Sequence, residues 1–204
     1  MVMSSSAPRT RIQEKNRSVI LAAGLEVFSQ YGFRGTTLDQ IADAAGLSKP
    51  NVLYYFASKE AIYTELLTEL LRTWLDPLMA MDADGDPVAE ILGYAKLKLR
   101  MSRDYPRESR LFANEILQGA PLIGAALRGD LKELVAEKVK IIRAWQVAGK
   151  IADIDPHHLI FSIWALTQHY ADFDVQVRAV MPESEPFPGA DAFIETLYQR
   201  LLKT

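Results

Sequence analysis

The sequence contains no cysteine, so neither a disulfide bond nor a thiolate metal site can form. This absence fits a reducing compartment. No stretch approaches the roughly 18 consecutive apolar residues that are needed to span a bilayer. Residues 1–18 also lack the apolar segment of a secretory signal. We therefore expect a soluble, cytoplasmic protein without a membrane partner.

Motifs of common enzyme classes are missing as well. The chain has no glycine-rich phosphate-binding loop and no G-x-S-x-G nucleophile turn. Its nearest approach to a metal site is His157 and His158 with Asp153 and Asp155, but adjacent residues on a helix diverge and no H-x-x-x-H pair is present. Asp155 is better explained as the N-cap of a helix. We predict a protein that is not an enzyme and that holds no metal or cofactor.

Neither sign of charge dominates, because 23 Lys and Arg stand against 26 Asp and Glu, a net charge of −3. The distribution is uneven. Residues 1–60 hold seven basic and five acidic residues, a net +2, and the remaining 144 hold sixteen and twenty-one, a net −5. This modest asymmetry suits an N-terminal part that faces DNA on an acidic body.

Apolar residues recur at helical spacing through almost the whole chain, and no segment reads convincingly as a strand. We predict an all-α fold of about nine helices. The first spans residues 9–30, a long one runs from about Pro121 to Gly149, and the last covers 190–203. Pro77 should break or kink the helix that starts after Ser58. Residues 182–189, PESEPFPG, are expected to form a loop.

Residues 36–56, TTLDQIADAAGLSKPNVLYYF, have the proportions of a helix-turn-helix. Thr37 and Gln40 form a capping-box pattern at the first helix, and Gly46 is a turn residue. Ser48 can cap the second helix, where Pro50 is tolerated in the first turn. We place a DNA-binding domain at residues 1–57 and a second domain at 58–204.

The second helix of this pair directs Val52 and Phe56 inward, which leaves polar chemistry on its other faces. Asn51 can bond an adenine edge, Lys49 can reach phosphate or guanine, and Pro50 or Leu53 can touch a thymine methyl. Phosphate contacts suit the remaining candidates. The predicted DNA-binding residues are Thr37, Ser48, Lys49, Pro50, Asn51, Leu53, Tyr54, Tyr55 and Lys59. On spacing alone, a plain helical hairpin with exposed polar residues stays open.

The stretch GFRGTTLDQIADAAGLSKPNVLYYFASKEAIY resembles the N-terminal signature of the TetR family of bacterial transcriptional regulators. The similarity covers residues 9 to about 65. It implies a homodimer with two DNA-reading heads, which binds a double-stranded operator. It also implies a C-terminal domain that binds a small ligand and dimerises.

Further along, KLKLRMSRDYPRESRLF and IDPHHLIFSIWALTQHYADF are similar to the members of this family that regulate pyrimidine utilisation. That similarity implies uracil or thymine as the effector. A pyrimidine presents a flat face and an edge of carbonyl oxygens and N–H groups. Trp74 can supply an aromatic plate, and the amide of Gln168 both donates and accepts. A family member that senses a more hydrophobic ligand is the alternative.

Other roles stay open for these residues. Trp74 could be core filling, and Gln168 could bond across a dimer interface. Trp164 lies one turn before Gln168 on the same face, and it is predicted as pocket wall or core. Tyr170 is a weaker ligand-binding candidate, because consecutive helical residues point about 100° apart and cannot all face one cavity.

The helix from Pro156 is apolar nearly all round, so it must be covered on several sides. The last helix carries a narrower apolar stripe. We expect these two helices from each subunit to form a two-fold symmetric four-helix bundle that makes the homodimer. Completion of the core within one chain is the alternative.

Overall fold

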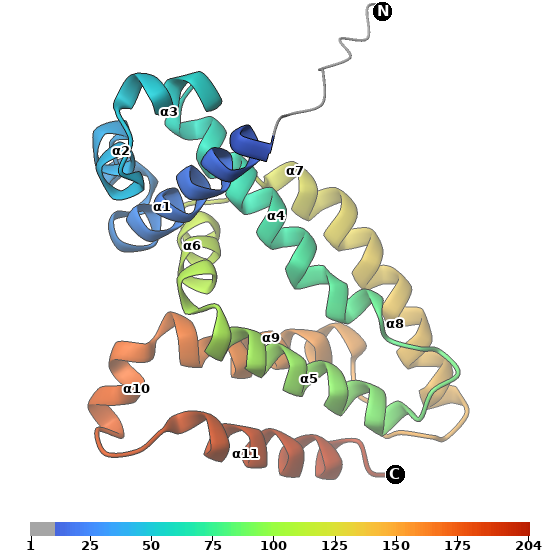
Figure 1. Cartoon of the computed structure of the whole chain (residues 1–204). Coiled ribbons are helices and arrows are strands. Elements are labelled where there is room, and N and C mark those ends of the chain that lie inside the picture. The colour runs from blue at the N-terminus through green and yellow to red at the C-terminus, as the bar shows by residue number, and fades with distance from the viewer. Residues whose placement is uncertain (1–10) are drawn as a thin grey trace, which may run out of the picture. The chain divides into compact units, whose positions relative to one another are not determined.

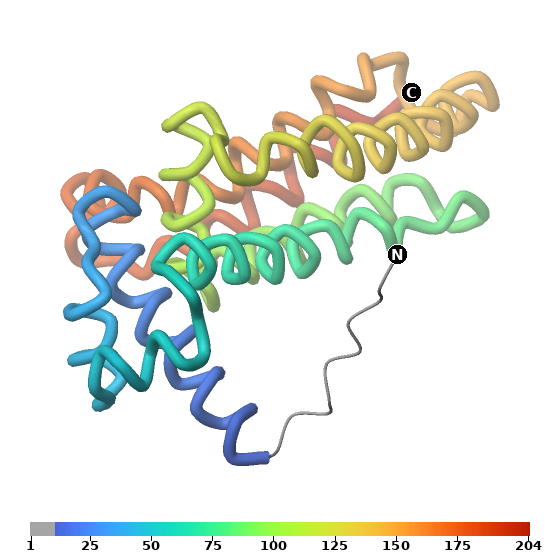
Figure 2. Tube along the Cα trace, turned by 90° about the horizontal axis from the view of Figure 1, so that it is seen from above, coloured from blue at the N-terminus to red at the C-terminus, as the bar shows by residue number. Residues whose placement is uncertain are grey.

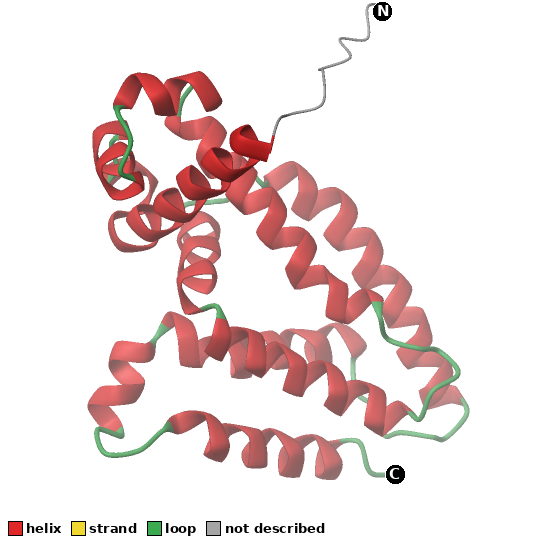
Figure 3. Cartoon of the chain, in the orientation of Figure 1, coloured by secondary structure: helices red, strands yellow, loops and turns green. Residues whose placement is uncertain are grey.

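The computed structural model describes residues 11–204, and these form helices and connecting turns with no strand among them (Figure 3). This confirms the prediction of an all-α fold. The chain divides into two compact units, Met1–Leu67 and Thr68–Thr204. The boundary falls inside a helix, and not at residue 57 where the sequence predicts it. The first ten residues of the expected N-terminal domain lie outside the described residues.

The N-terminal unit is built from three helices and the first part of a fourth (Figure 1): α1 (Arg11–Gly35), α2 (Leu38–Ala45), α3 (Lys49–Tyr55) and α4 (Lys59–Met79). Gly32, with φ 66° and ψ 176°, interrupts α1 close to the predicted end of that helix. A Cβ at Gly24 of α1 would lie 2.8 Å from Cγ2 of Ile62 in α4. Glycine therefore permits the close approach of these two helices.

The C-terminal unit holds the rest of α4 followed by seven helices and one π-helical turn: α5 (Pro87–Asp104), α6 (Pro106–Leu117), α7 (Gly124–Ala126), the π-turn Leu127–Leu131, α8 (Lys132–Val147), α9 (Pro156–Asp172), α10 (Asp174–Val180) and α11 (Pro186–Leu201). In two perpendicular views, α5 lies beside both α9 and α11 (Figures 1 and 2). Buried side chains of α4, α5, α8, α9 and α11 form one continuous core. The C-terminal unit is thus built around this apolar core, to which α5 and α9 both contribute.

Several boundaries differ from the sequence-based prediction. The helix expected from Pro121 to Gly149 is divided into α7, the π-turn and α8. The π-turn adds a residue to one helical turn, which hydrophobic periodicity cannot reveal. Helix α4 continues past Pro77 to Met79. Helix α11 begins at Pro186, inside the expected loop 182–189, because proline is compatible with the first turn of a helix.

Candidate functional site

Helix α3 exposes one face and buries the other, as the sequence predicts. Val52 is fully buried and Phe56 nearly so, which confirms the inward pair. Asn51 is exposed, and 42% of Leu53 and 71% of Tyr54 are accessible. The side chains with base-reading chemistry therefore stand on the open side of α3.

Hydrogen bonds at the helix starts hold α2 and α3 in place. The backbone N–H of Gln40 donates to Oγ1 of Thr37 at 3.2 Å, and the backbone N–H of Thr37 donates back to Oε1 of Gln40 at 2.8 Å, so the predicted capping box is present. Gly46 ends α2 in the left-handed region at φ 64°. Oγ of Ser48 accepts from the backbone N–H of Asn51 at 3.4 Å. The tight turn that positions α3 is thus specified by local contacts.

Two of the predicted DNA contacts, Lys49 and Tyr55, have side-chain partners within the chain. Nζ of Lys49 pairs with Asp39 at 2.9 Å, and both side chains are exposed. Such a surface pair is weak, so a phosphate can replace the carboxylate. The hydroxyl of half-buried Tyr55 accepts from Nδ2 of Asn16 at 2.8 Å. Lys49 and Tyr55 both lie within the N-terminal unit, which carries the helix-turn-helix.

Lys59 is a correction to the predicted set of DNA contacts. Its Nζ donates to the backbone carbonyls of Phe33 at 2.8 Å and Thr36 at 2.6 Å, and it also lies 4.6 Å from the ring centroid of Phe33. The ammonium therefore satisfies carbonyls at the end of α1 instead of pointing to solvent. A phosphate contact by Lys59 does not fit this geometry.

A small cavity of about 70 Å³ lies within the C-terminal unit. Its walls come from α4, α5, α6, the π-turn and α9. The lining residues are Leu71, Trp74, Leu75, Tyr94, Lys98, Phe112, Leu131, Trp164 and Gln168. Three of the four predicted ligand-binding residues, Trp74, Trp164 and Gln168, thus line one cavity.

Tyr170, the fourth candidate, does not line this cavity. It lies two residues after Gln168, which is about 200° around α9. Its ring packs 5.9 Å from the ring of Phe187 in α11. Tyr170 therefore belongs to the contact between α9 and α11, and the structure does not support its assignment to the pocket.

Aromatic side chains shape the cavity. The rings of Trp74 and Phe112 meet nearly at right angles, 76°, with centroids 6.0 Å apart. Nε1 of Trp164 donates to the hydroxyl of Tyr94 at 2.6 Å. Burial raises the pKa of Tyr94, so its phenol stays neutral. The aromatic walls are therefore fixed against one another, while the amide of half-buried Gln168 makes no hydrogen bond to another residue of the described chain.

Of the lining residues that sequence reasoning misses, Lys98 is the charged one. Only 4% of it is exposed, and its Nζ lies 4.6 Å from the ring centroid of Trp74. Burial lowers the pKa of Lys98 to about 8, and the negative charge of Asp172 opposes this shift. The only sequence signal is its place in KLKLRMSRD on α5, where lysines alternate with leucines and look like a solvated face.

A larger cavity of about 490 Å³ adjoins the small one and shares four wall residues with it, Phe112, Leu131, Trp164 and Gln168. Most of its other walls are apolar and come from α6, the π-turn and the end of α9. Asp172 lies at its edge, where Oδ1 accepts from Oγ of Ser109 at 2.5 Å. We call the two spaces the inner chamber and the outer chamber.

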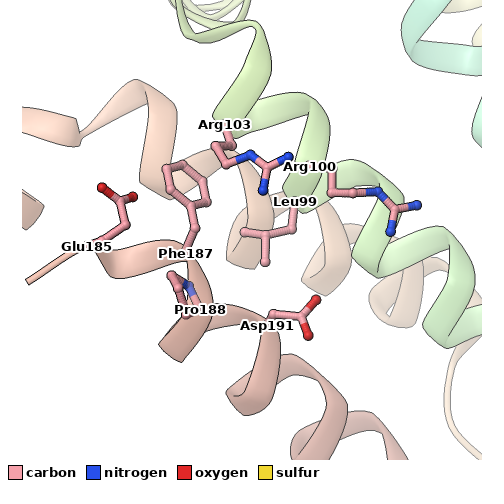
Figure 4. Close-up of a pocket in the computed structure, with 7 residues that line it drawn as sticks. All are labelled: Leu99, Arg100, Arg103, Glu185, Phe187, Pro188 and Asp191. Carbon is pink, nitrogen blue, oxygen red and sulfur yellow. The ribbon is translucent and has the colours of Figure 1, made fainter.

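A third cavity, of about 470 Å³, lies between α5 and the start of α11 (Figure 4). Arg100 and Arg103 line it from α5, and Glu185 and Asp191 line it from the other side. Nε of Arg103 is already paired with Asp104 at 2.8 Å. Because both signs of charge meet here, the cleft does not favour a ligand of either charge.

Asp155 caps α9 as predicted, accepting from the backbone N–H of His157 at 2.9 Å and of His158 at 3.2 Å. Residues 11–204 contain no group of three or more His, Asp or Glu that is arranged to hold a metal. Among those same residues, no helix is both long and apolar enough to cross a membrane.

Comparison with known proteins bears on both units. Residues 20–66 match the family described as bacterial regulatory proteins, tetR family, and residues 67–203 match the family described as YcdC-like protein, C-terminal region. The chain is 53% identical over 178 residues to the HTH-type transcriptional regulator RutR of Escherichia coli K12, a match that covers 87% of this chain and 84% of that protein. It is 35% identical over 82 residues to the HTH-type transcriptional repressor KstR2 of Mycobacterium tuberculosis H37Rv, covering 38% of this chain and 39% of the other.

A solved structure shares the fold. A regulatory protein of the tetR family from Rhodococcus RHA1 superposes with a TM-score of 0.74 at 21% identity, over 93% of this chain and 98% of that one. Proteins of this family are transcriptional regulators, which confirms the prediction that the chain is not an enzyme. They bind DNA operators and small-molecule effectors. On the match of both units and the identity over most of its length, this chain belongs to the TetR family of bacterial transcriptional regulators.

Proposed function

We propose that this regulator controls genes of pyrimidine use and that uracil or thymine, bound in the inner chamber, changes its affinity for DNA. One observation carries the proposal: Trp74 and Gln168, which are far apart in the sequence, line the same small cavity. The resemblance to family members that regulate pyrimidine utilisation supports the same effector.

The chemistry of the chamber fits a flat heterocycle. Its volume of about 70 Å³ leaves no room for a bulky ligand within the inner chamber. The indole of Trp74 offers a stacking face, and Trp164 and Tyr94 close the sides. The amide of Gln168 is unpaired with the protein and can match an O=C–N–H edge. An effector of this kind gives the amide of Gln168 a partner that the protein itself does not supply.

We propose that the exposed side of α3 contacts the DNA. Asn51 and Leu53 are exposed there and can meet base edges, and Lys49 can exchange its surface partner Asp39 for a phosphate. Thr37, Ser48, Pro50, Tyr54 and Tyr55 are the further contacts that we propose. Lys59 is left out because its ammonium is held by α1 carbonyls.

We also propose that α9 and α11 form the homodimer interface. Phe161 of α9 is 46% exposed and Phe193 of α11 is 53% exposed in the single chain. Large apolar side chains in such positions are typical of surfaces covered by a second subunit. Helix α4 runs from the N-terminal unit to the wall that holds Trp74, so it joins the two functions along the chain.

The outer chamber favours the second candidate, a larger and more hydrophobic effector. Its volume of about 490 Å³ and its apolar walls from α6 could hold an alkyl or aryl group. Thermal shift measurements with uracil, thymine and a panel of apolar compounds separate the two candidates, because a bound ligand raises the melting temperature.

Calorimetric titration with uracil tests the effector directly. Gln168→Leu has similar volume but no amide, so we expect an intact fold and a loss of roughly 1–3 kcal/mol, about tenfold to a hundredfold in affinity. Affinity for DNA without ligand should barely change. The variant should then fail to respond at ordinary uracil concentrations, because a ligand shifts an equilibrium only through differential binding.

Asn114→Leu is the matched control, because Asn114 lines the outer chamber alone and its loss should leave uracil binding unchanged. Equal binding by Gln168→Leu and the wild type would contradict the Gln168 contact. If the wild type does not bind uracil, the pyrimidine proposal is wrong. If Gln168→Leu dissociates into monomers, Gln168 belongs to the dimer interface.

A further inference from the structure

Two lysines of the C-terminal unit are buried to the same extent, with 4% of each exposed, yet they differ in what they contact. Nζ of Lys138 donates to the backbone carbonyls of Met79 at 3.1 Å and Met81 at 3.4 Å, and it pairs with Glu137. The ammonium of Lys138 therefore has its acceptors at and just after the C-terminal end of α4. Nζ of Lys98 donates to no other described residue and lines the inner chamber.

A buried ammonium without protein hydrogen bonds is costly, because burial removes its water. Two interactions reduce that cost: the face of Trp74, 4.6 Å away, and the charge of Asp172, which acts on Lys98 without direct pairing. Neither contact accepts a hydrogen bond directly. The three N–H donors of Lys98 are therefore available to a ligand in the chamber.

The amide of Gln168 cannot by itself select one pyrimidine. When it is rotated by 180°, its donor and acceptor exchange places. One orientation matches the C4 carbonyl and N3–H of uracil, and the other matches the C4 amino group and bare N3 of cytosine. These two bases have nearly the same shape, so apolar walls discriminate poorly between them. A lysine is different because it has donors only.

We propose that Lys98 sets the chemical selectivity of the inner chamber, so that it accepts a pyrimidine with carbonyl oxygens at its edge and rejects one with an amino group there. The inference rests on the proposed function, because it assumes that a pyrimidine is the effector. A ring stacked on Trp74 displaces the ammonium of Lys98 from the indole face to the edge of the ligand, a movement that the flexible lysine stem permits. There the ammonium meets the C4 carbonyl oxygen of uracil, which has a second lone pair beside the one that Gln168 uses. At the same position it faces the C4 amino group of cytosine, which leaves both sets of donors unpaired.

The test is calorimetric titration of uracil and of cytosine into the full-length wild type, Lys98→Met and Lys96→Met. For the wild type we expect uracil to bind at least roughly tenfold more tightly than cytosine. Lys98→Met should weaken uracil binding by about tenfold to a hundredfold while cytosine binding holds or improves, so that the ratio approaches one. Lys96 lies on the same helix but pairs with Glu195 at 2.8 Å outside the chamber, so its variant should keep the wild-type ratio.

The ratio of the two affinities is the deciding quantity, since a purely structural role for Lys98 would lower both together. Lys98→Arg, which keeps a donor-only cation, should retain preference for uracil. Equal wild-type affinities for the two bases, or an unchanged ratio in Lys98→Met, would overturn the selectivity role and leave uracil sensing intact. If Lys98→Met does not fold, Lys98→Gln takes its place: its amide both donates and accepts, so its ratio should also approach one. Failure of the wild type to bind either base would remove the proposed function and the Lys98 inference together.

Discussion

Asn51 illustrates how a single residue can be free for recognition while its backbone is committed to the fold. Its backbone N–H bonds Oγ of Ser48, which caps α3. Its side-chain amide is exposed and bonds no other described residue. The amide can therefore pair with the N6 and N7 atoms of an adenine without cost to the helix.

Asn51→Ala should relax the preference for one base pair of the operator by roughly 1–3 kcal/mol, with little effect on binding to unrelated DNA. The folded unit should be unaffected, because the substituted side chain is solvent-exposed and the cap is kept. Binding measurements on a set of single-base operator variants check this. Equal weakening on specific and scrambled sites would show that Asn51 does not read a base.

Among the elements, the junction of α1, α2 and α4 is held by groups that are distant in the sequence. The ammonium of Lys59, at the start of α4, donates to the carbonyl of Phe33, in the last turn of α1, and to that of Thr36, between α1 and α2. Arg17 of α1 donates to the carbonyl of Tyr55 at 3.1 Å and pairs with Glu65 of α4. These contacts fix the element that carries Asn51, so they bear on DNA reading indirectly.

Lys59→Met should lower the stability of the N-terminal unit by about 1–3 kcal/mol, because it leaves two carbonyls without their charged donor. The comparison is Lys49→Met, which removes only an exposed pair and should change stability by less than about 0.5 kcal/mol. Urea unfolding of both variants measures the difference.

For DNA affinity we expect the opposite order, with the larger effect in the Lys49 variant and the smaller in the Lys59 variant. Lys49→Met should weaken binding to all sequences and reduce the salt slope by about one, whereas folded Lys59→Met should keep the wild-type slope. A reduced slope in Lys59→Met alone would show that the ammonium leaves the α1 carbonyls to bind phosphate.

At the scale of the whole molecule, the exposed aromatic side chains of α9 and α11 are unexplained by one chain. Helix α5 covers one side of each of these helices. Phe161 and Phe193 remain about half exposed. We expect a second subunit to cover this surface, so that the dimer carries two copies of α3 for the two half-sites of an operator.

Phe193→Asp should shift the protein from dimer to monomer, because a charge in an apolar interface is left without a partner. Sedimentation analysis at micromolar concentration measures the state directly. Val147→Asp is the control, since Val147 of α8 is 90% exposed and lies outside the proposed interface. A dimeric Phe193→Asp variant would place the interface elsewhere.

Local features of this protein are determined by the sequence alone. The capping box of Thr37 and Gln40, the left-handed Gly46 and the N-cap Asp155 each depend on residues within a few positions of one another. The all-α class follows from the same short-range periodicity, and the resemblance of long motifs identifies the family. Resemblance, rather than spacing, is also what singled out Trp74 and Gln168 for the pocket.

Only the tertiary structure decides which distant side chains meet. The inner chamber draws its walls from four helices and a π-turn, so Tyr94, Lys98 and Phe112 become pocket residues through packing that no local pattern records. The same packing turns Tyr170 toward α11 and commits Lys59 to the carbonyls of α1. From the sequence alone, a lysine in a predicted helix is expected to be exposed to solvent. Whether its ammonium faces water, a backbone carbonyl or a chamber depends on the elements that fold over it.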